Sequence, residues 1–145
     1  MRRGIGAWEG CRGATPGLHI ALVAGDLADL IVWREAAVLA HDTIAAARRM
    51  HGVGSVGAAD QLARAAESIP ANIAEAYGRG FGRDGTRFLR VARGSATELE
   101  SHLWLAERTG RVPGALAAQL LGRTQRVRAL LRGLMKATAA RAPRG

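Results

Sequence analysis

Residues 68–75 read Ser-Ile-Pro-Ala-Asn-Ile-Ala-Glu and place a proline inside an apolar pattern of helical spacing. The pattern consists of Leu62, Ala66, Ile69, Ile73 and Ala76. Their separations of three or four residues are typical of one face of an α-helix. A proline in a helix interior removes a backbone hydrogen bond and clashes with the preceding turn, at a cost of about 3 kcal/mol or more. We therefore expect a kinked or broken helix that its neighbours hold in place.

The composition indicates one small, mainly helical domain. A chain of 145 residues is long enough for a single domain with one modest core. Apolar residues make up 48% of the chain but aromatic residues only 4%, so the apolar content is mostly Ala, Leu and Val. Runs of β-branched and aromatic residues mark strands, and their near absence favours helices.

The single cysteine and the short apolar runs argue against several classes of protein. Because Cys11 is the only cysteine, the chain has no intramolecular disulfide framework and no Cys-based zinc site. No apolar run approaches the roughly 18 residues of a transmembrane helix. The apolar run at residues 20–24 is too short for the core of a signal peptide. We therefore expect a cytoplasmic protein with no membrane partner.

The chain divides into an N-terminal tail, a helical domain and a short C-terminal tail. Residues 1–25 are so rich in glycine that we expect a disordered tail, and residues 141–145 form a loose end. Between them, the domain at residues 26–140 has apolar residues at helical spacing over about 26–50, 58–77, 84–109 and 113–140. The predicted buried stripe of the first helix is Leu30, Trp33, Ala37, Ala40, Ile44 and Ala47. That of the third is Leu89, Ala92, Ala96, Leu99, Leu103 and Ala106.

The predicted helix ends carry ordinary start and stop residues. Asp26 or Asp29 caps the first helix, and Asp84 caps the third. Gly78 ends the second helix in the left-handed conformation, and Pro113 opens the fourth. Four amphipathic helices joined by short turns predict an all-α protein, an antiparallel up-down four-helix bundle.

The sequence contains no convincing catalytic constellation. It has no phosphate-binding loop between a strand and a helix, and Cys11 has no neighbouring base. Metal sites in bundles use Glu and His on facing helices, and the chain offers Glu98 and His102, with His41 and Glu75 as further ligands. The first pair stands four residues apart and has no second copy. The sequence therefore predicts neither enzymatic activity nor a metal or other cofactor.

The distribution of charge is more informative than its total. Eight basic residues and no acid lie between residue 111 and the C-terminus, so this segment supplies +8 of the net charge of +9. Two groups of basic residues repeat every three or four residues, so the members of each group lie on one face of their own helix. They are Arg83, Arg87 and Arg90 on the third helix, and Arg128, Arg132 and Lys136 on the fourth. Such an unbalanced face favours a polyanion, held in a salt-sensitive and largely sequence-independent way. The candidate nucleic-acid-binding residues are Arg83, Arg87, Arg90, Arg123, Arg128, Arg132 and Lys136.

Two alternatives remain open at this point. The arginines can equally form a solvated face in an arginine-rich proteome, and no aromatic residue interleaves with them for base stacking. Trp104 neighbours a predicted core position, so it either covers the edge of the bundle or contributes to an interface with another chain.

Several phrases give the chain a resemblance to a known family over about residues 27–138. They are Val32-Trp33-Arg34-Glu35-Ala36, the run Gln-Leu-Ala-Arg-Ala-Ala-Glu-Ser-Ile-Pro-Ala-Asn-Ile-Ala-Glu at 61–75, the run Arg-Phe-Leu-Arg-Val-Ala-Arg-Gly-Ser at 87–95, and Glu98-Leu99-Glu100. In their order and spacing the chain resembles the small four-helix bundle proteins encoded within intervening sequences of bacterial 23S ribosomal RNA genes, and their stand-alone relatives.

The resemblance implies a fold, an assembly and partners. It implies an antiparallel four-helix bundle without established enzymatic activity, assembled as a ring that is a homopentamer. The family is similar in fold to the accessory protein of diversity-generating retroelements, a basic pentameric barrel that binds nucleic acid and a reverse transcriptase. By that analogy, basic residues of the third and fourth helices face RNA or DNA. The alternative is a structural or adaptor ring that binds a protein partner such as a reverse transcriptase.

The family phrases also contain residues for which we expect structural roles, namely Trp33, Ser68, Pro70, Asn72 and Glu75. Asn72 and Glu75 follow the proline by about one turn and could bond backbone groups that it frees. The alternative is a polar site facing a neighbouring subunit. The chain departs from the family pattern at Ala76, where glycine is usual, and at the glycine-rich segment 50–59, which lacks the usual Phe-Pro.

Overall fold

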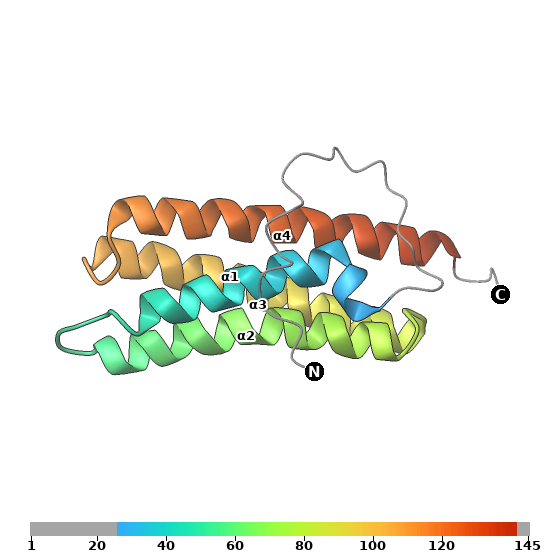
Figure 1. Cartoon of the computed structure of the whole chain (residues 1–145), viewed down its shortest axis with the longest axis horizontal. Coiled ribbons are helices and arrows are strands. Elements are labelled where there is room, and N and C mark those ends of the chain that lie inside the picture. Colours follow the sequence, from blue (N-terminus) through green and yellow to red (C-terminus); the bar gives the residue numbers. More distant parts are fainter. Residues whose placement is uncertain (1–25, 142–145) are drawn as a thin grey trace, which may run out of the picture.

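The computed structural model describes residues 26–141, which form four long antiparallel helices (Figure 1). They are α1 (Ile31–Ala47), α2 (Ser55–Gly78), α3 (Arg83–Arg108) and α4 (Gly114–Arg141), and a short 3-10 helix, η2 (Leu27–Asp29), precedes α1. The predicted all-α four-helix bundle is confirmed. The predicted N-terminal tail, residues 1–25, and residues 142–145 of the predicted C-terminal tail lie outside the described residues. Residue 141, predicted as the start of that tail, is the last residue of α4.

The four helices enclose one core. Each helix packs against two others, in the order α1, α2, α3, α4 and back to α1, with the most extensive packing between α2 and α3 and the least between α1 and α4. The fully buried large side chains are mostly leucine and isoleucine, among them Leu39, Leu62, Ile69, Ile73, Leu89, Leu99, Leu103, Leu120 and Leu131. Burying each such side chain stabilises the fold by about 1.5–3 kcal/mol. The predicted stripes of α2 and α3 are buried at every position.

The first helix differs from its prediction in two ways. It begins at Ile31 rather than near residue 26, because Leu30 is extended (φ −75°, ψ 107°) and separates η2 from α1. In η2 the Asp26 N–H donates to Asp29 Oδ2 at 3.1 Å. The buried face also lies one position away from the predicted stripe, on Val32, Ala36, Leu39, Ala40, Thr43, Ala46 and Ala47. Trp33, Ala37 and Ile44 are only half-buried, because a helix this rich in alanine and other apolar residues fits two neighbouring stripes equally well.

The second helix runs without a break through Pro70, so of the two expected outcomes the broken helix is wrong, and the kink stays a prediction. Ile69 and Ile73 on either side of the proline are fully buried, and their packing offsets the cost of the lost hydrogen bond. The Asn72 amide donates to the Ser68 carbonyl at 2.7 Å and to Ser68 Oγ at 3.0 Å. Ser68 Oγ in turn lies 2.8 Å from Ser95 Oγ on α3. Asn72 therefore links the proline turn of α2 to α3.

The turn between α2 and α3 also differs from its prediction. Gly78 is still helical, and the left-handed residues are Gly80 (φ 73°) and Phe81 (φ 55°). A left-handed non-glycine residue costs about 1–2 kcal/mol, and Phe81 offsets it by burying its ring and donating its N–H to the Ala76 carbonyl at 3.0 Å. The N-cap of α3 is Gly82 rather than Asp84. A Cβ at Gly85 would lie 3.0 Å from the Ala76 carbonyl oxygen, so α2 and α3 approach each other very closely here.

Candidate nucleic-acid interface

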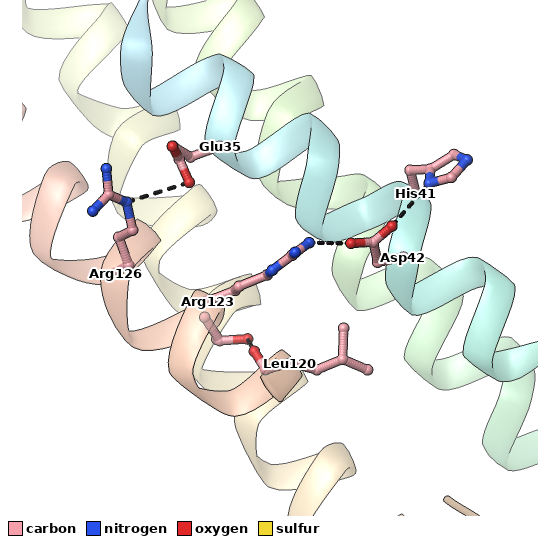
Figure 2. A network of polar contacts seen from close by, with 7 residues as sticks. Glu35, His41, Asp42, Leu120, Arg123 and Arg126 are labelled. Carbon is pink, nitrogen blue, oxygen red and sulfur yellow. Dashed lines mark hydrogen bonds and ion pairs between the residues drawn. The ribbon is translucent and has the colours of Figure 1, made fainter. Parts of the chain in front are cut away.

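Three arginines in the middle of α4 pair with acids on neighbouring helices. Arg123 pairs with Asp42, and Arg126 Nε lies 3.3 Å from Glu35 Oε2, both across the contact between α4 and α1. Figure 2 shows these two arginines reaching from α4 toward the carboxylates of α1. His41 extends the group, with its Nδ1 3.0 Å from Asp42 Oδ1. Because all these side chains are partly exposed, each pair stabilises the bundle by only about 0.2–1 kcal/mol.

The third pair lies between α4 and α3. Arg128 Nη1 donates to Glu100 Oε2, and both side chains are better shielded than the α1–α4 pairs, at 31% and 19% exposed. Arg128 Nε is buried and has no hydrogen-bond partner among the described residues. The charges of the candidate residues Arg123 and Arg128 are therefore partly neutralised by acids on neighbouring helices, and these ion pairs help to hold the helices together.

Six other cations form what we call the basic face: Arg83, Arg87, Arg90, Arg93, Arg132 and Lys136. All six are exposed, and none makes an ion pair within residues 26–141. Five of them are candidates from the sequence. Arg93 was not among those candidates, although it continues the spacing of Arg87 and Arg90 by another three residues.

The Arg128–Glu100 pair aligns the two helices and brings these cations to the same end of the bundle. Since α3 and α4 are antiparallel, one turn from Arg128 to Arg132 corresponds to one turn back along α3, to about residue 96. A further turn places Lys136 level with about residue 92, between Arg90 and Arg93. Arg93 also precedes Glu100 by seven residues, two helical turns, and so projects toward α4. The two predicted basic groups thus lie at one end of the bundle, and Arg93 is the α3 cation on the side of the helix that faces α4.

The C-terminal part of α3 carries the opposite charge to its N-terminal part. Residues 83–93 contain four arginines against one aspartate, whereas residues 98–108 contain three glutamates against one arginine. Trp104 and Leu105 lie in this acidic half and are 46% and 58% exposed. The exposure of Trp104 leaves both of its sequence-based interpretations open, the edge of the bundle and an interface with another chain.

The aromatic rings on the first part of α3 and around the turn before it are already engaged. The Arg79 guanidinium carbon lies 4.8 Å from the centre of the Phe88 ring, over its face, and Arg79 Nε is held by Glu75 Oε1 at 2.7 Å. Phe81 is buried, and its ring meets that of Tyr77 edge-on with centroids 6.0 Å apart.

The predicted roles of Asn72 and Glu75 beside Pro70 differ from those in the structure. Pro70 has no N–H to donate to the Ala66 carbonyl, but Asn72 bonds Ser68 and not that carbonyl. Glu75 bonds the side chain of Arg79 and not a backbone group.

The structure does not gather the candidate metal ligands. His102 Nε2 lies 3.6 Å from Glu98 Oε1, but His41 pairs with Asp42 and Glu75 with Arg79. Within residues 26–141 no group of three or more His, Cys, Asp or Glu side chains is placed to hold a metal ion. In the same range no helix combines the length and hydrophobicity that a membrane span requires.

A hollow of about 250 Å³ opens between α1 and α4. Its lining consists of Asp42, Ala45, Ala46, Arg49, Leu116, Gln119 and Leu120. Its one carboxylate is engaged by Arg123, and the lining offers no hydroxyl, thiol or imidazole as a nucleophile or base. This hollow therefore has no arrangement suited to catalysis.

Comparison with known proteins agrees with the architecture. The sequence model of one family, described as 23S rRNA-intervening sequence protein, matches residues 28–133. Among solved structures, the chain is similar to a protein of unknown function from the S23 ribosomal protein family of Bacteroides thetaiotaomicron VPI-5482. The two share 22% sequence identity with a TM-score of 0.65, over 73% of this chain and 99% of that chain, a likeness of fold. No curated protein matches the chain.

Proposed function

Since this chain belongs to the 23S rRNA-intervening sequence protein family, we propose that it is a non-enzymatic protein that binds nucleic acid through its basic face. The observation that carries the proposal is the set of six exposed cations on α3 and α4 without ion-pair partners in residues 26–141. Unpaired guanidinium and ammonium groups on neighbouring helices attract a phosphate backbone at long range.

The binding is mainly electrostatic. Each phosphate that a cation neutralises releases condensed counterions, so the logarithm of affinity falls with the logarithm of salt by about 0.7–0.9 per contact. Sequence-independent binding of this kind typically has a Kd of about 10⁻⁴–10⁻⁶ M at physiological salt. We further propose that the protein assembles as a homo-oligomer, the pentamer that its family resemblance implies. Several copies of a weak site then raise the overall affinity by raising the effective concentration.

Charge-matched variants test the proposal. Replacing Arg90, Arg93, Arg132 and Lys136 by glutamine removes four cations from the basic face. The control replaces Arg48, Arg49, Arg64 and Arg108, four exposed arginines elsewhere on the bundle. Fluorescence anisotropy with a labelled 20-base-pair RNA duplex should show the salt slope of the first variant reduced by about 3–4. The control should keep most of the wild-type slope. Equal losses in the two variants would show that only total charge matters.

A second candidate function is that of an adaptor ring for a protein partner such as a reverse transcriptase. It is favoured by the exposed Trp104 and Leu105, which lie away from the basic face. Aromatic residues are enriched where proteins contact one another. Titration of the labelled protein with a purified retroelement reverse transcriptase tests this candidate. Trp104→Gln together with Leu105→Gln should weaken the complex at least tenfold while leaving RNA binding unchanged; an unaltered complex would contradict it.

A further inference from the structure

We infer that the basic face selects double-stranded over single-stranded nucleic acid, because it presents two rows of cations and no uncovered aromatic ring. The inference rests on the proposed function and specifies its substrate class. Two features of the described residues carry it: the arrangement of the cations on α3 and α4, and the engagement of Phe88, Phe81 and Tyr77, the aromatic rings on the first part of α3 and around the turn before it.

The cations form one row on each helix. The α3 row, from Arg83 to Arg93, extends over ten residues, or about 15 Å, and the α4 row, Arg132 and Lys136, over about 6 Å. Packed helices lie about 8–10 Å apart, and the alignment set by the Arg128–Glu100 pair places Arg132 and Lys136 level with about residues 96 and 92, so the two rows overlap only near Arg93 and are otherwise staggered along the bundle. A duplex is rigid and carries phosphates on two strands, so it can meet staggered cations on two helices without being ordered. A single strand is flexible and must be ordered to bind.

Single-strand binders usually combine a basic groove with aromatic rings on which bases stack. Phe88 lies between Arg87 and Arg90 in the sequence, which makes it the natural ring for this purpose. One face of that ring is covered by the Arg79 guanidinium, and the ion pair with Glu75 holds Arg79 there. Phe81 is buried, and Tyr77 is half-buried with its ring against that of Phe81. The basic end therefore favours recognition of phosphates over recognition of bases.

The exposed Trp104 does not supply the missing ring. It follows Arg93 by eleven residues, about 16 Å along α3, and lies in the half of the helix that carries Glu98 and Glu107. A single strand stacked on Trp104 would lie away from the cations of the basic face and close to the carboxylates of Glu98 and Glu107.

The α3 row itself corresponds to about four base-pair steps of duplex, so one subunit contacts only a short stretch of nucleic acid.

Competition binding on the full-length protein tests the inference. A labelled RNA duplex of 20 base pairs is displaced by the unlabelled duplex or by an unstructured 20-nucleotide oligouridine, at equal phosphate concentration and the same salt. We expect the duplex to compete at least tenfold more strongly. Equal or better competition by the single strand overturns the inference and leaves the proposed function standing. If neither nucleic acid binds, the proposed function fails, and the inference fails with it.

Variants of the covered ring give an independent test. Arg79→Met removes the guanidinium from the Phe88 face and should raise single-strand affinity relative to duplex affinity by about fivefold, the effect of one stacked base. The matched control is Arg64→Met, which removes the exposed arginine of another i,i+4 pair on the same helix, with Asp60. Phe88→Leu should leave single-strand binding by the otherwise native protein unchanged. A loss of single-strand binding in Phe88→Leu, or no gain in Arg79→Met, contradicts the inference.

Discussion

The middle of α4 and its C-terminal part contain the same kind of charge and use it differently. In the middle part, Arg123, Arg126 and Arg128 each meet an acid on α1 or α3. In the C-terminal part, Arg132 and Lys136 are exposed and make no ion pair within residues 26–141. In sequence the five residues form one continuous basic series without an acid. The difference shows that the charge available to a partner depends on what the neighbouring helices place opposite each residue.

The largest effect that we expect from this comparison is on binding. Arg132→Gln with Lys136→Gln should weaken duplex RNA binding about 50-fold at 0.1 M salt, since each lost phosphate contact costs roughly eightfold there. The free energy of unfolding should change by less than about 0.5 kcal/mol, because both side chains are exposed and make no ion pair with the other described residues. Anisotropy and urea unfolding measure the two quantities. A large loss of stability with intact binding would reverse the roles that we assign to the two parts of α4.

The next effect is on stability. Arg128→Gln leaves the mostly shielded Glu100 carboxylate without its partner and should lower the free energy of unfolding by about 1–2 kcal/mol. Urea unfolding at pH 7 measures this change, and Arg132→Gln, one turn away on the same helix, is the control. If the two variants were equally stable, Arg128 would not differ from the exposed cations beyond it.

The smallest effect concerns the α1–α4 pairs. Arg123→Gln with Arg126→Gln should cost about 0.4–2 kcal/mol of stability, the sum of two partly exposed ion pairs. Because salt screens such pairs, the difference from the wild type should shrink between 0.05 and 1 M NaCl. Duplex affinity should fall by less than about threefold at 0.1 M salt, below the roughly eightfold cost of one lost phosphate contact. A drop as large as that of the Arg132 and Lys136 variant would mean that the paired arginines also contact phosphate.

The fold could be predicted from the sequence where charged residues alternate with apolar ones. On α3 the arginines and glutamates leave only one apolar stripe, and it is the buried one. On α1, 12 of the 17 residues are alanine or larger apolar residues, so spacing alone did not distinguish the stripe containing Trp33 from the one containing Leu39. The turn after α2 has glycines at 78, 80 and 82, and spacing did not show that Gly80 would be the left-handed one, followed by Phe81.

The sequence predicted which residues give the candidate site its positive charge, but not which of them form ion pairs with acids on other helices. The repeats of Arg83, Arg87 and Arg90 are visible in the sequence, and the same spacing would have added Arg93. The pairing of Arg123 with Asp42 and of Arg128 with Glu100 joins residues on different helices. It depends on the alignment of those helices, which the pattern within one helix does not contain. For the same reason, the covering of Phe88 by Arg79 could not be predicted from sequence.

The most direct test of the account is the salt dependence of duplex RNA binding by three proteins: the wild type, Arg132→Gln with Lys136→Gln, and Arg123→Gln with Arg126→Gln. Each variant loses two positive charges from α4. We predict that the slope of log affinity against log salt falls by about 2 in the first variant and stays near the wild-type value in the second. Equal slopes in the two variants would contradict the division of α4 into a middle part with paired arginines and a C-terminal part whose cations are available to a partner.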